Sequence, residues 1–546
     1  MNSTLLVLAI FGIYWAIISA LDKKGVLERH NIRAHGPLLM IGTKKGQKLL
    51  ERLAKPRRFW RTFAGAGQPL MLIAMCFMFA VLLYADYLML VHPIYPSALT
   101  EPRNILLLPG INEFIPLIWG LVGLIVAIVV HEFSHAILGK VENIRVKSMG
   151  IVLALIPVAF FTELDDEQLF GIKETGEKVK PLATKDERVR ILIAGVMANF
   201  VIALIAFILF FGPILGAIVP TGNVMVASVT PGSPADLVGI QQGVIITQLD
   251  KVEITSIHDV YSFMHSIQPR GPIAVHAVDN GIKKTFNVDV TPQNIIFGVE
   301  IMDVIDGYPA KDAGITPGMR IVRINNMPTP TLDLFMTSMN ATHPAQTVNV
   351  RVIDNGTEKV FNVTLAEPPH EGMKKGFLGV TVAPSVDLLG AKLSEYPAAD
   401  VLSFLQSIPS MLGTLSGWLI LVGLPFMGVM GSKLVGFTFP VIQFYQPVGW
   451  ALPLGNGIFW IANLVLWVAW INFYVGLFNC LPAVPLDGGH VFREMAISAV
   501  SHITKNKDKQ ERISNVVVNG LALLILASFI FLFIGPYLMH GMHGFI

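Results

Sequence analysis

The stretch "VVHEFSHAILGK", residues 129–140, ends an apolar run that begins near residue 114. This run is longer than the roughly 20 mostly apolar residues that a helix needs to cross a bilayer. It nevertheless contains His131, Glu132 and His135. An ionisable side chain at the centre of a membrane helix costs about 2.5 to 3.5 kcal/mol. We therefore expect these side chains to share a partner and to have a function.

The two histidines are spaced to bind one metal ion. Residues four apart lie on the same face of a helix, about one turn from each other, so both imidazoles can reach one zinc ion. Glu132 is next to His131 and can reach a metal-bound water as a general base. A catalytic zinc site also needs a third protein ligand and an open position for water.

The third ligand is expected in "FNCLPAVPLDGGH", residues 478–490. Asp487 follows an apolar span at 455–480 and lies at the same expected membrane depth as the two histidines. Cys480 and His490 are competing ligands by their chemistry. We favour Asp487, because a cysteine beside a span is more often a packing residue and His490 lies beyond a Gly-Gly turn.

Composition identifies a membrane protein. The chain has 546 residues, of which 53% are hydrophobic and 14% charged, and its net charge of +2 gives no reason to expect a nucleic-acid partner. Its two cysteines, Cys76 and Cys480, both lie in or beside apolar segments, so we expect no disulfide framework. A region at 404–436 carries several glycines and Pro425, which favours a broken or re-entrant segment, and 150–162 is expected to form a membrane-dipping hairpin. The six expected spans are 4–21, 69–92, 114–138, 191–218, 455–480 and 514–539.

Basic residues predict the orientation. Residues 22–61 contain twelve Lys or Arg, whereas 93–113 contains only Arg103. Because cytoplasmic loops carry the excess of Lys and Arg, the first loop is expected inside and the N-terminus outside. The same count places the polar region 220–400 outside and the metal ligands near the cytoplasmic side. The basic loop that contains Arg493 and Arg512 also falls inside, which agrees with this orientation.

The polar region contains a tandem repeat. "VTPGSPADLVGIQQGVIITQLD" at 229–250 aligns with "VIDGYPAKDAGITPGMRIVRIN" at 304–325, an offset of 304 minus 229, or 75. Each copy alternates short apolar strands with glycine turns and has an Asp-Asn-Gly hairpin signal. The copies resemble the PDZ domains of bacterial and archaeal membrane proteases. That resemblance implies binding of an extended peptide at a sheet edge, and the alternative is that the copies act only as spacers.

The pair of motifs, HEFSH with NCLPAVPLDGGH, resembles the site-2 protease family of intramembrane zinc metalloproteases. The resemblance implies that His131, His135 and Asp487 bind one Zn²⁺ per chain and that Glu132 activates water. Many bacterial members of that family read NxxPxPxLDG, but in this sequence Val484 stands at the second proline position. This difference brings the subfamily and the presentation of substrate into question, but not the binding of zinc.

Two asparagines also match that family. "GVMAN" supplies Gly195 and Asn199, and Asn479 lies eight residues before Asp487. The resemblance makes Asn199 and Asn479 candidates for holding the substrate backbone or the developing oxyanion. For Asn199, ordinary hydrogen bonding between helices is an equal alternative.

The sequence therefore predicts a polytopic α-helical membrane protein, with about six spans plus a re-entrant or broken segment, and two inserted small α+β PDZ-like domains. The expected activity is cleavage within or near the membrane helix of single-span membrane proteins, which releases a cytoplasmic fragment. A non-catalytic scaffold that binds peptides, and a transporter, are the alternatives; no inverted repeat supports the transporter. The expected parts are a first span with a basic cytoplasmic segment (1–65), a membrane part with the HExxH helix (66–221), two PDZ-like domains (222–296 and 297–370) and a membrane part with the LDG motif (371–546).

Overall fold

The chain forms two compact units in a computed structural model. The first unit comprises residues 1–210, 425–435 and 463–546, and the second comprises 211–424 and 436–462. The structure describes every residue except 1–2, 30–31, 44–45, 93–103, 105–108, 113, 155, 174–176, 178, 268–270, 280, 291–294, 355, 369–374, 428–435 and 541–546.

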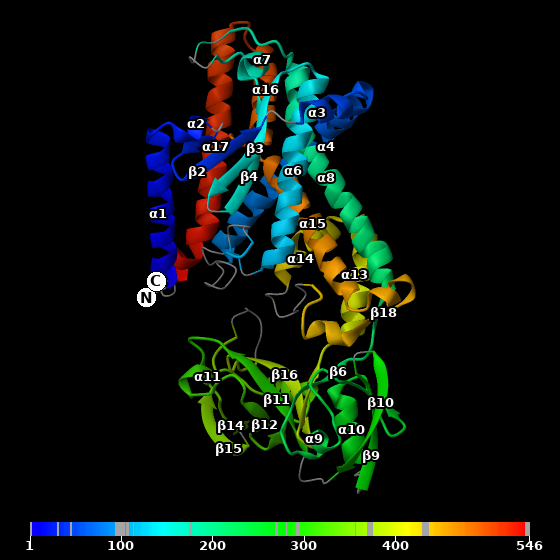
Figure 1. Ribbon diagram of the computed structural model, residues 1–546. Helices are drawn as coiled ribbons and strands as arrows, with labels where there is room; N and C mark the ends of the chain where they lie inside the picture. The colour runs from blue at the N-terminus through cyan, green and yellow to red at the C-terminus, as the bar shows by residue number, and fades with distance from the viewer. Residues whose placement is uncertain are drawn as a thin grey trace. The chain divides into compact units, whose positions relative to one another are not determined.

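The first unit consists mainly of long helices (Figure 1). Among the described residues, five helices of the chain are long and apolar enough to cross a membrane. These are α4 (Arg57–Val91), α6 (Leu117–Val141), α8 (Lys185–Leu209, continued by a helical turn to Ala217), α15 (Gly457–Asn479) and α17 (Lys507–His540). The shorter helices are α2 (Val26–Arg29), α3 (Gln47–Leu53), α7 (Asp166–Phe170) and α16 (Asp487–Ser501).

Five of the six expected spans coincide with these five helices. The remaining one, 4–21, coincides with helix α1 (Ser3–Lys23), which is 21 residues long. The region 404–436 is not one straight helix. It contains the end of α13 (Ala398–Met411) and α14 (Leu415–Met427), and 428–435 lies outside the described residues.

Helix α8 begins at a capping box. The Thr184 hydroxyl accepts a hydrogen bond from the Glu187 N–H, and the Glu187 carboxylate accepts one from the Thr184 N–H. This pair satisfies two backbone donors that a helix start leaves without partners. The helix then packs along α4 and α6 (Figure 1). Every residue from Ile191 to Asn199 is buried, so this part of the helix is buried all round, as expected in the interior of a bundle.

A buried carboxylate joins these three helices at one end. Glu142, at the end of α6, has a fully buried side chain. Its two oxygens accept hydrogen bonds from Arg61 of α4 at 2.7 Å and from Arg190 of α8 at 2.6 Å. A buried charge is tolerated only when it is paired and hydrogen-bonded. Glu142 therefore fixes the ends of α4, α6 and α8 relative to one another.

A small antiparallel sheet accompanies α6. Its strand order is β1-β2-β3-β4, and β4 lies along α6. The expected hairpin at 150–162 is present, as β3 and β4, which pair directly. Because β4 ends the sheet, it pairs with only one strand among the described residues. The strand bounds are β1 Ile32–His35, β2 Leu38–Thr43, β3 Val146–Ala154 and β4 Ile156–Leu164.

The second unit contains the tandem repeat. Its strands form one sheet with the order β10-β9-β7-β6-β17-β16-β11-β12-β14-β15, to which the short strands β8 and β13 are added. The first repeat comprises β6 Val224–Val229, α9 Pro234–Leu237, β7 Ile245–Leu249, β8 Val252–Glu253, α10 Ile257–Ile267, β9 Gly271–Asp279 and β10 Ile282–Val290. The second comprises β11 Ile295–Val304, α11 Pro309–Asp312, β12 Arg320–Ile324, β13 Met327–Pro328, α12 Leu332–Asn340, β14 Thr347–Asp354 and β15 Thr357–Thr364.

One hairpin completes both repeats. Strand β16 (Val380–Leu388) pairs with β11 of the second repeat, and β17 (Ala391–Glu395) pairs with β6 of the first. The two strands also pair with each other, for example Ser385 with Ser394. The core of the first repeat therefore includes Leu393, about a hundred residues after the end of β10. The second repeat is nested within the first.

Equivalent hydrogen bonds close the two repeats. The Ala310 N–H donates to the Leu378 carbonyl at 3.0 Å in the second repeat. In the first, the Ala235 N–H donates to the Leu389 carbonyl at 3.2 Å. The following glycines, Gly379 and Gly390, both have positive φ and leave no room for a Cβ atom. A leucine carbonyl followed by a glycine with positive φ thus makes the same contact in each repeat.

The remaining elements of the second unit are short. Helices α13 and α14 follow the hairpin, and strand β5 pairs with β18. The bounds are β5 Ile218–Pro220 and β18 Tyr445–Pro447, with short helical turns at Phe210–Ile214, Leu215–Ala217, Val441–Phe444 and Gly449–Leu454.

Glu142→Gln tests the buried carboxylate. We expect the free energy of unfolding to fall by about 3 kcal/mol, because the substitution leaves two arginines without their buried counter-charge. The measurement is denaturant titration of the full chain in detergent micelles. Glu177→Gln is the matched control, since its pair with Lys173 is exposed and should change stability by less than about 1 kcal/mol. Equal effects of the two substitutions would contradict the assignment.

Candidate metal centre

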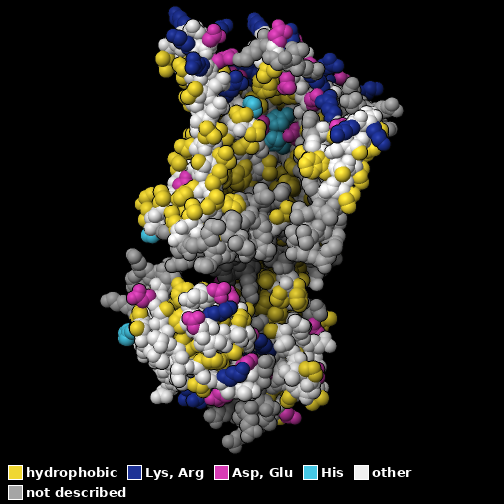
Figure 2. Space-filling model, turned by 90° about the vertical axis from the view of Figure 1, so that its left-hand side faces the viewer, with side chains coloured by type: hydrophobic (Ala, Val, Ile, Leu, Met, Phe, Trp, Pro, Cys, Tyr) yellow, Lys and Arg dark blue, Asp and Glu magenta, His cyan; other side chains and the backbone are white. Residues whose placement is uncertain are grey.

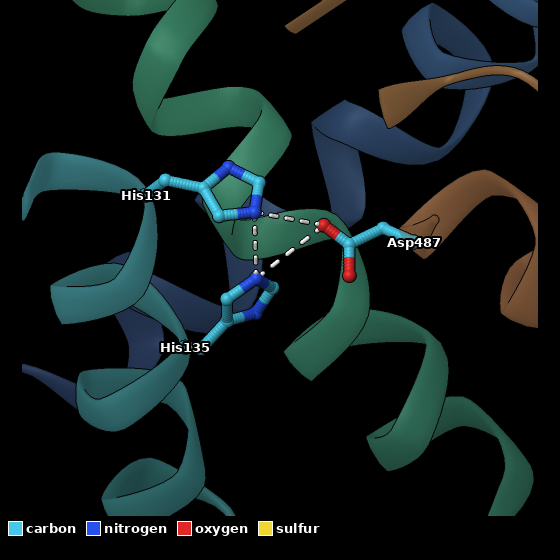
Figure 3. A group of neighbouring side chains, drawn as sticks. All are labelled: His131, His135 and Asp487. Carbon is cyan, nitrogen blue, oxygen red and sulfur yellow. Dashed lines mark hydrogen bonds and ion pairs between the residues drawn. The ribbon is translucent and has the colours of Figure 1, made fainter. Parts of the chain in front are cut away.

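Three side chains from distant parts of the first unit meet at one point (Figure 3). His131 and His135 project from consecutive turns of α6, and Asp487 is the first residue of α16. Asp487 Oδ2 lies 3.1 Å from His131 Nε2 and 3.4 Å from His135 Nε2. The two Nε2 atoms are 3.1 Å apart. The three potential ligand atoms thus form a nearly equilateral triangle.

This triangle fits zinc. Ligand atoms about 2.0 to 2.1 Å from a tetrahedral zinc ion lie roughly 3.3 to 3.4 Å from one another. The distances of 3.1 to 3.4 Å are close to that value. Asp487 Oδ2 is buried and, among the described residues, has no partner with hydrogen-bond geometry. A metal ion bound by the three atoms would satisfy this oxygen and leave a fourth position open.

The surroundings keep Asp487 ionised. Burial would raise the pKa of its carboxyl, but when no metal is bound the imidazoles in their protonated form, first of all that of His135, outweigh burial and hold the pKa well below its usual range. Gly488 and Gly489 follow directly. A Cβ atom on either would collide with the backbone of the 480–484 turn, so the two glycines allow α16 to begin against that turn.

The competing ligands lie elsewhere. Cys480 and His490 are not in the cluster of metal-ligating groups found among the described residues. The ring of His490 stacks on that of Phe170, with centroids 5.8 Å apart. Cys480 is fully buried, and burial raises the pKa of its thiol, which disfavours the thiolate that binds metals.

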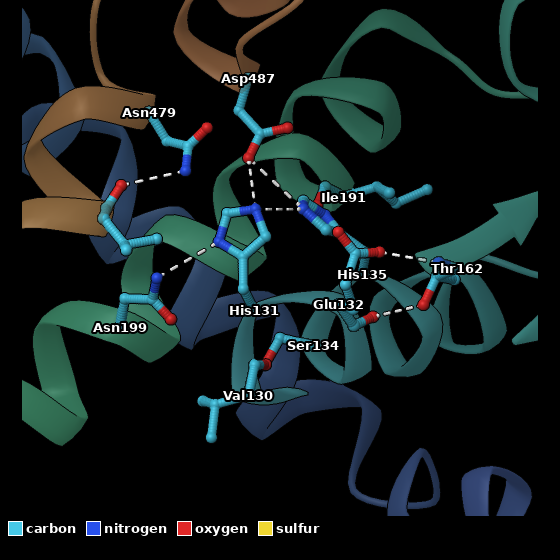
Figure 4. Close-up of polar contacts among 11 residues, drawn as sticks. Val130, His131, Glu132, Ser134, His135, Thr162, Ile191, Asn199, Asn479 and Asp487 are labelled. Carbon is cyan, nitrogen blue, oxygen red and sulfur yellow. Dashed lines mark hydrogen bonds and ion pairs between the residues drawn. The ribbon is translucent and has the colours of Figure 1, made fainter. Parts of the chain in front are cut away.

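Glu132 is held by strand β4 (Figure 4). Its Oε2 atom accepts a hydrogen bond from the Thr162 N–H, and its backbone carbonyl accepts one from the Thr162 hydroxyl, both at 2.7 Å. These two bonds attach the HExxH helix to the edge strand. Sequence reasoning did not identify Thr162, because the contact depends on the register between a helix and a strand 30 residues away.

Helix α8 supplies the surface against which the histidines pack. The Nδ1–H of His135 donates a hydrogen bond of 2.8 Å to the Ile191 carbonyl. One turn later, a Cβ atom on Gly195 would lie 2.6 Å from His135 Nε2 and 2.7 Å from two ring atoms of His131. The missing side chain of Gly195 therefore makes room for both imidazoles. The carbonyl of Ile191 is a second contact that no sequence pattern identified.

The two asparagines lie beside the cluster on two different helices (Figure 4). Asn199 is fully buried on α8, and its Nδ2 atom is 3.5 Å from His131 Nδ1. Asn479, at the end of α15, donates a hydrogen bond from Nδ2 to the Val475 carbonyl of its own helix at 3.0 Å. Of these two asparagines, Asn199 is the one whose side chain contacts a potential metal ligand.

An ion pair fixes α16 on α8. Arg188 donates two hydrogen bonds to Glu494, at 2.8 and 2.9 Å, and the side chains are only 15% and 12% exposed. A bidentate pair of this kind sets orientation as well as distance. Because α16 begins at Asp487, the pair helps to hold the carboxylate near the imidazoles.

The site is accessible from the surface. The side chains of His131, His135 and Asp487 retain between 10% and 13% of their exposure. Figure 2 shows histidine and acidic side chains in a hollow bordered by hydrophobic side chains. A small cavity of about 230 Å³ lies beside the site, lined by Glu132, Phe133, Met149, Phe161 and other residues of α6 and the small sheet.

Gly195→Ala tests the close approach of α8. We expect zinc affinity to fall by at least about tenfold, because the added Cβ displaces both imidazoles, and effects of this size are typical when ligand orientation is lost. The measurement is competition with a chelator in detergent. Gly520→Ala is the control, because a Cβ at Gly520 in α17 meets open space. Unchanged affinity in Gly195→Ala would contradict the packing.

Comparisons with known proteins identify the family. Residues 119–527 match the model of peptidase family M50. The chain is 25% identical to protease RseP of Yersinia pestis over 430 residues, which cover 69% of this chain and 90% of that protein. It is 27% identical to an uncharacterized protein of Methanocaldococcus jannaschii, with 56% and 73% covered, and 31% identical to a candidate zinc metalloprotease of Clostridium perfringens, with 26% and 45% covered. The family match extends over more than half of the chain, so the protein belongs to peptidase family M50, the site-2 protease family of membrane-embedded metalloproteases.

Proposed function

We propose that the protein is an intramembrane zinc metalloendopeptidase that hydrolyses a peptide bond within or near the transmembrane helix of a membrane-protein substrate. The observation that carries this proposal is the triangle of His131, His135 and Asp487 with Glu132 on the same helix. One zinc ion per chain would be bound by the three ligand atoms. Family membership supports the same metal and the same class of reaction.

The residues of the chain divide the chemistry between them. When bound, zinc lowers the pKa of water in its open coordination position and polarises a peptide carbonyl. Glu132 takes the proton from the attacking water and passes it to the nitrogen of the leaving amine. The Thr162 N–H holds one oxygen of this carboxylate during the transfer. One water is consumed, one C–N bond breaks, and a carboxylate and an amine are released.

Strand β4 is suited to present the substrate. A transmembrane helix satisfies its own backbone, so one turn must unwind before a carbonyl can be attacked. Apart from Thr162, whose N–H is taken by Glu132, the outer edge of β4 pairs with no other strand among the described residues and offers backbone partners to an extended segment. Because Thr162 of this strand also holds Glu132, a segment paired with β4 would lie beside the catalytic carboxylate.

The distribution of charge supports a cytoplasmic active site. The two basic segments, 22–61 and 493–512, are expected inside. In the first unit, α3, α7 and the start of α17 lie at the same end, and Lys and Arg side chains gather there (Figures 1 and 2). The proposal therefore places the N-terminus and the repeats outside the cytoplasm and releases the product inside.

The PDZ-like repeats act as a gate through their bulk. The two repeats share one sheet, in which β17 and β16 are internal strands that pair with each other where the repeats meet. A peptide could add there only by displacing the hairpin. Exclusion of substrates with intact extracytoplasmic domains therefore fits better than recognition of a newly cut end between β16 and β17. A non-catalytic scaffold that binds peptides through its PDZ-like repeats is the second candidate.

Glu132→Gln tests the catalytic proposal. We expect cleavage of a model single-span substrate in detergent to slow by about 10² to 10⁴-fold, as is typical when a general base is lost. Zinc content should remain that of the unsubstituted protein, because the glutamate is not a ligand. Asp487→Asn is the companion variant and should lose zinc as well as activity. Full cleavage by a zinc-loaded Glu132→Gln protein would refute the mechanism.

A disulfide across the hairpin tests the gate. Ser385→Cys with Ser394→Cys places two thiols at directly opposite positions of β16 and β17. If the repeats act through bulk, the oxidised and reduced proteins should cleave at rates within about twofold and reject an intact extracytoplasmic domain equally. The single variant Ser385→Cys controls for the substitution. A loss of cleavage on oxidation that reduction restores would show that the hairpin must open.

A further inference from the structure

The two potential histidine ligands expose their second ring nitrogens to the same helix. The Nε2 atom of each histidine faces Asp487, and the Nδ1 atom of each histidine contacts a group of α8 (Figure 4). His135 Nδ1 meets the Ile191 carbonyl at 2.8 Å, and His131 Nδ1 meets the Asn199 amide at 3.5 Å. The partners are 199 minus 191, or eight, residues apart, with Gly195 midway. Ile191, Gly195 and Asn199 therefore lie on consecutive turns along one side of α8. The first and the last each contact a histidine Nδ1 atom, and the glycine between them leaves space for the rings.

The chemistry of imidazole determines what each Nδ1 needs. A neutral histidine that binds a metal through Nε2 carries its proton on Nδ1, and that N–H requires an acceptor. The Ile191 carbonyl is an acceptor for His135. For His131 the corresponding group is the side-chain amide of Asn199, which has one oxygen and one NH₂ and presents either after rotation by 180°.

A buried oxygen indicates which end of the amide faces His131. Asn199 is fully buried, and its Oδ1 atom has no hydrogen-bond partner among the described residues. An unpaired buried acceptor costs about 1 to 3 kcal/mol. When His131 carries its proton on Nδ1, the present orientation of the Asn199 amide places its Nδ2 donor opposite the Nδ1–H donor of His131. Rotation of the amide brings Oδ1 to the Nδ1–H and resolves both mismatches in one hydrogen bond.

We propose that Asn199 is a positioning residue whose amide oxygen accepts a hydrogen bond from His131 Nδ1–H, and so fixes the ring and the tautomer that bind zinc. This inference rests on the proposed zinc site and assigns Asn199 a role other than binding the oxyanion. Its full burial supports that role, because the metal ligands keep 10% to 13% of their side-chain exposure and Asn199 keeps none.

The test separates zinc binding from catalysis. Asn199→Leu keeps the approximate size and removes the acceptor, and Asn199→Asp keeps an acceptor oxygen. Zinc affinity of each full-length variant is measured by chelator competition in detergent, and kcat and KM are measured at saturating zinc. Asn472→Leu is the control, since Asn472 is also a fully buried asparagine of a membrane helix but bonds to Val468 of its own helix.

We expect Asn199→Leu to bind zinc about 10 to 100-fold more weakly, the usual effect of losing the hydrogen bond behind a metal ligand. Excess zinc should restore kcat, with KM unchanged. Asn199→Asp should keep its zinc affinity within about threefold, because a carboxylate is a common acceptor behind a ligating histidine. Asn472→Leu should bind zinc as the unsubstituted protein does.

Two results would overturn the inference alone, and a third would overturn the proposed function together with it. Asn199→Leu that binds zinc normally but has a lower kcat would indicate an oxyanion role instead. If Asn199→Leu does not fold, a tenfold or larger loss of zinc affinity in Asn199→Asp would refute it equally. Absence of zinc binding by the unsubstituted protein would remove the proposed function itself, and the inference with it.

Discussion

The structure depends on bringing one carboxylate within 3.1 to 3.4 Å of two imidazole nitrogens inside a bundle of apolar helices. Groups of this kind are stable away from water only when they are paired or bound to a metal. Several otherwise unrelated features serve this convergence. Gly195 removes a side chain where the imidazoles pack, glycines after Asp487 let α16 start against a turn, and the pair Arg188–Glu494 holds α16 on α8.

Helix α8 is the element that organises the site. It contributes no metal ligand, yet it contacts the second nitrogen of both histidines and carries the ion pair to α16. Its start is fixed by a capping box and by the buried Glu142 cluster. The geometry of the three potential ligands is thus set by a chain of contacts that begins well away from them.

Local patterns predicted the parts of the site, and contacts between distant segments explain what they missed. The spacing of His131 and His135 on one helix face, and a carboxylate after a span of matching depth, predicted three side chains that the structure places together. Their role as ligands stays a prediction. Thr162 and the Ile191 carbonyl were missed, because a hydrogen bond to the backbone depends on how helices and strands pack and leaves no mark on residue type.

The same reasoning applies to the rest of the fold. Hydropathy located the long helices, and internal similarity located the two repeats. The nesting of the repeats was not predicted, since β17 completes the first repeat from about a hundred residues beyond it, and no sequence repeat marks that strand. The break within 404–436 was predicted from its glycines and proline, and the structure has two helices there.

The most direct test of the central claim is X-ray absorption spectroscopy of the zinc-loaded full chain. We expect one zinc per chain with only nitrogen and oxygen neighbours at about 2.0 to 2.1 Å, and with the outer-shell pattern of two imidazoles. Any zinc that the Asp487→Asn variant retains should have one oxygen neighbour fewer. A sulfur neighbour near 2.3 Å, which would indicate Cys480, or a spectrum that lacks imidazole, would contradict the account.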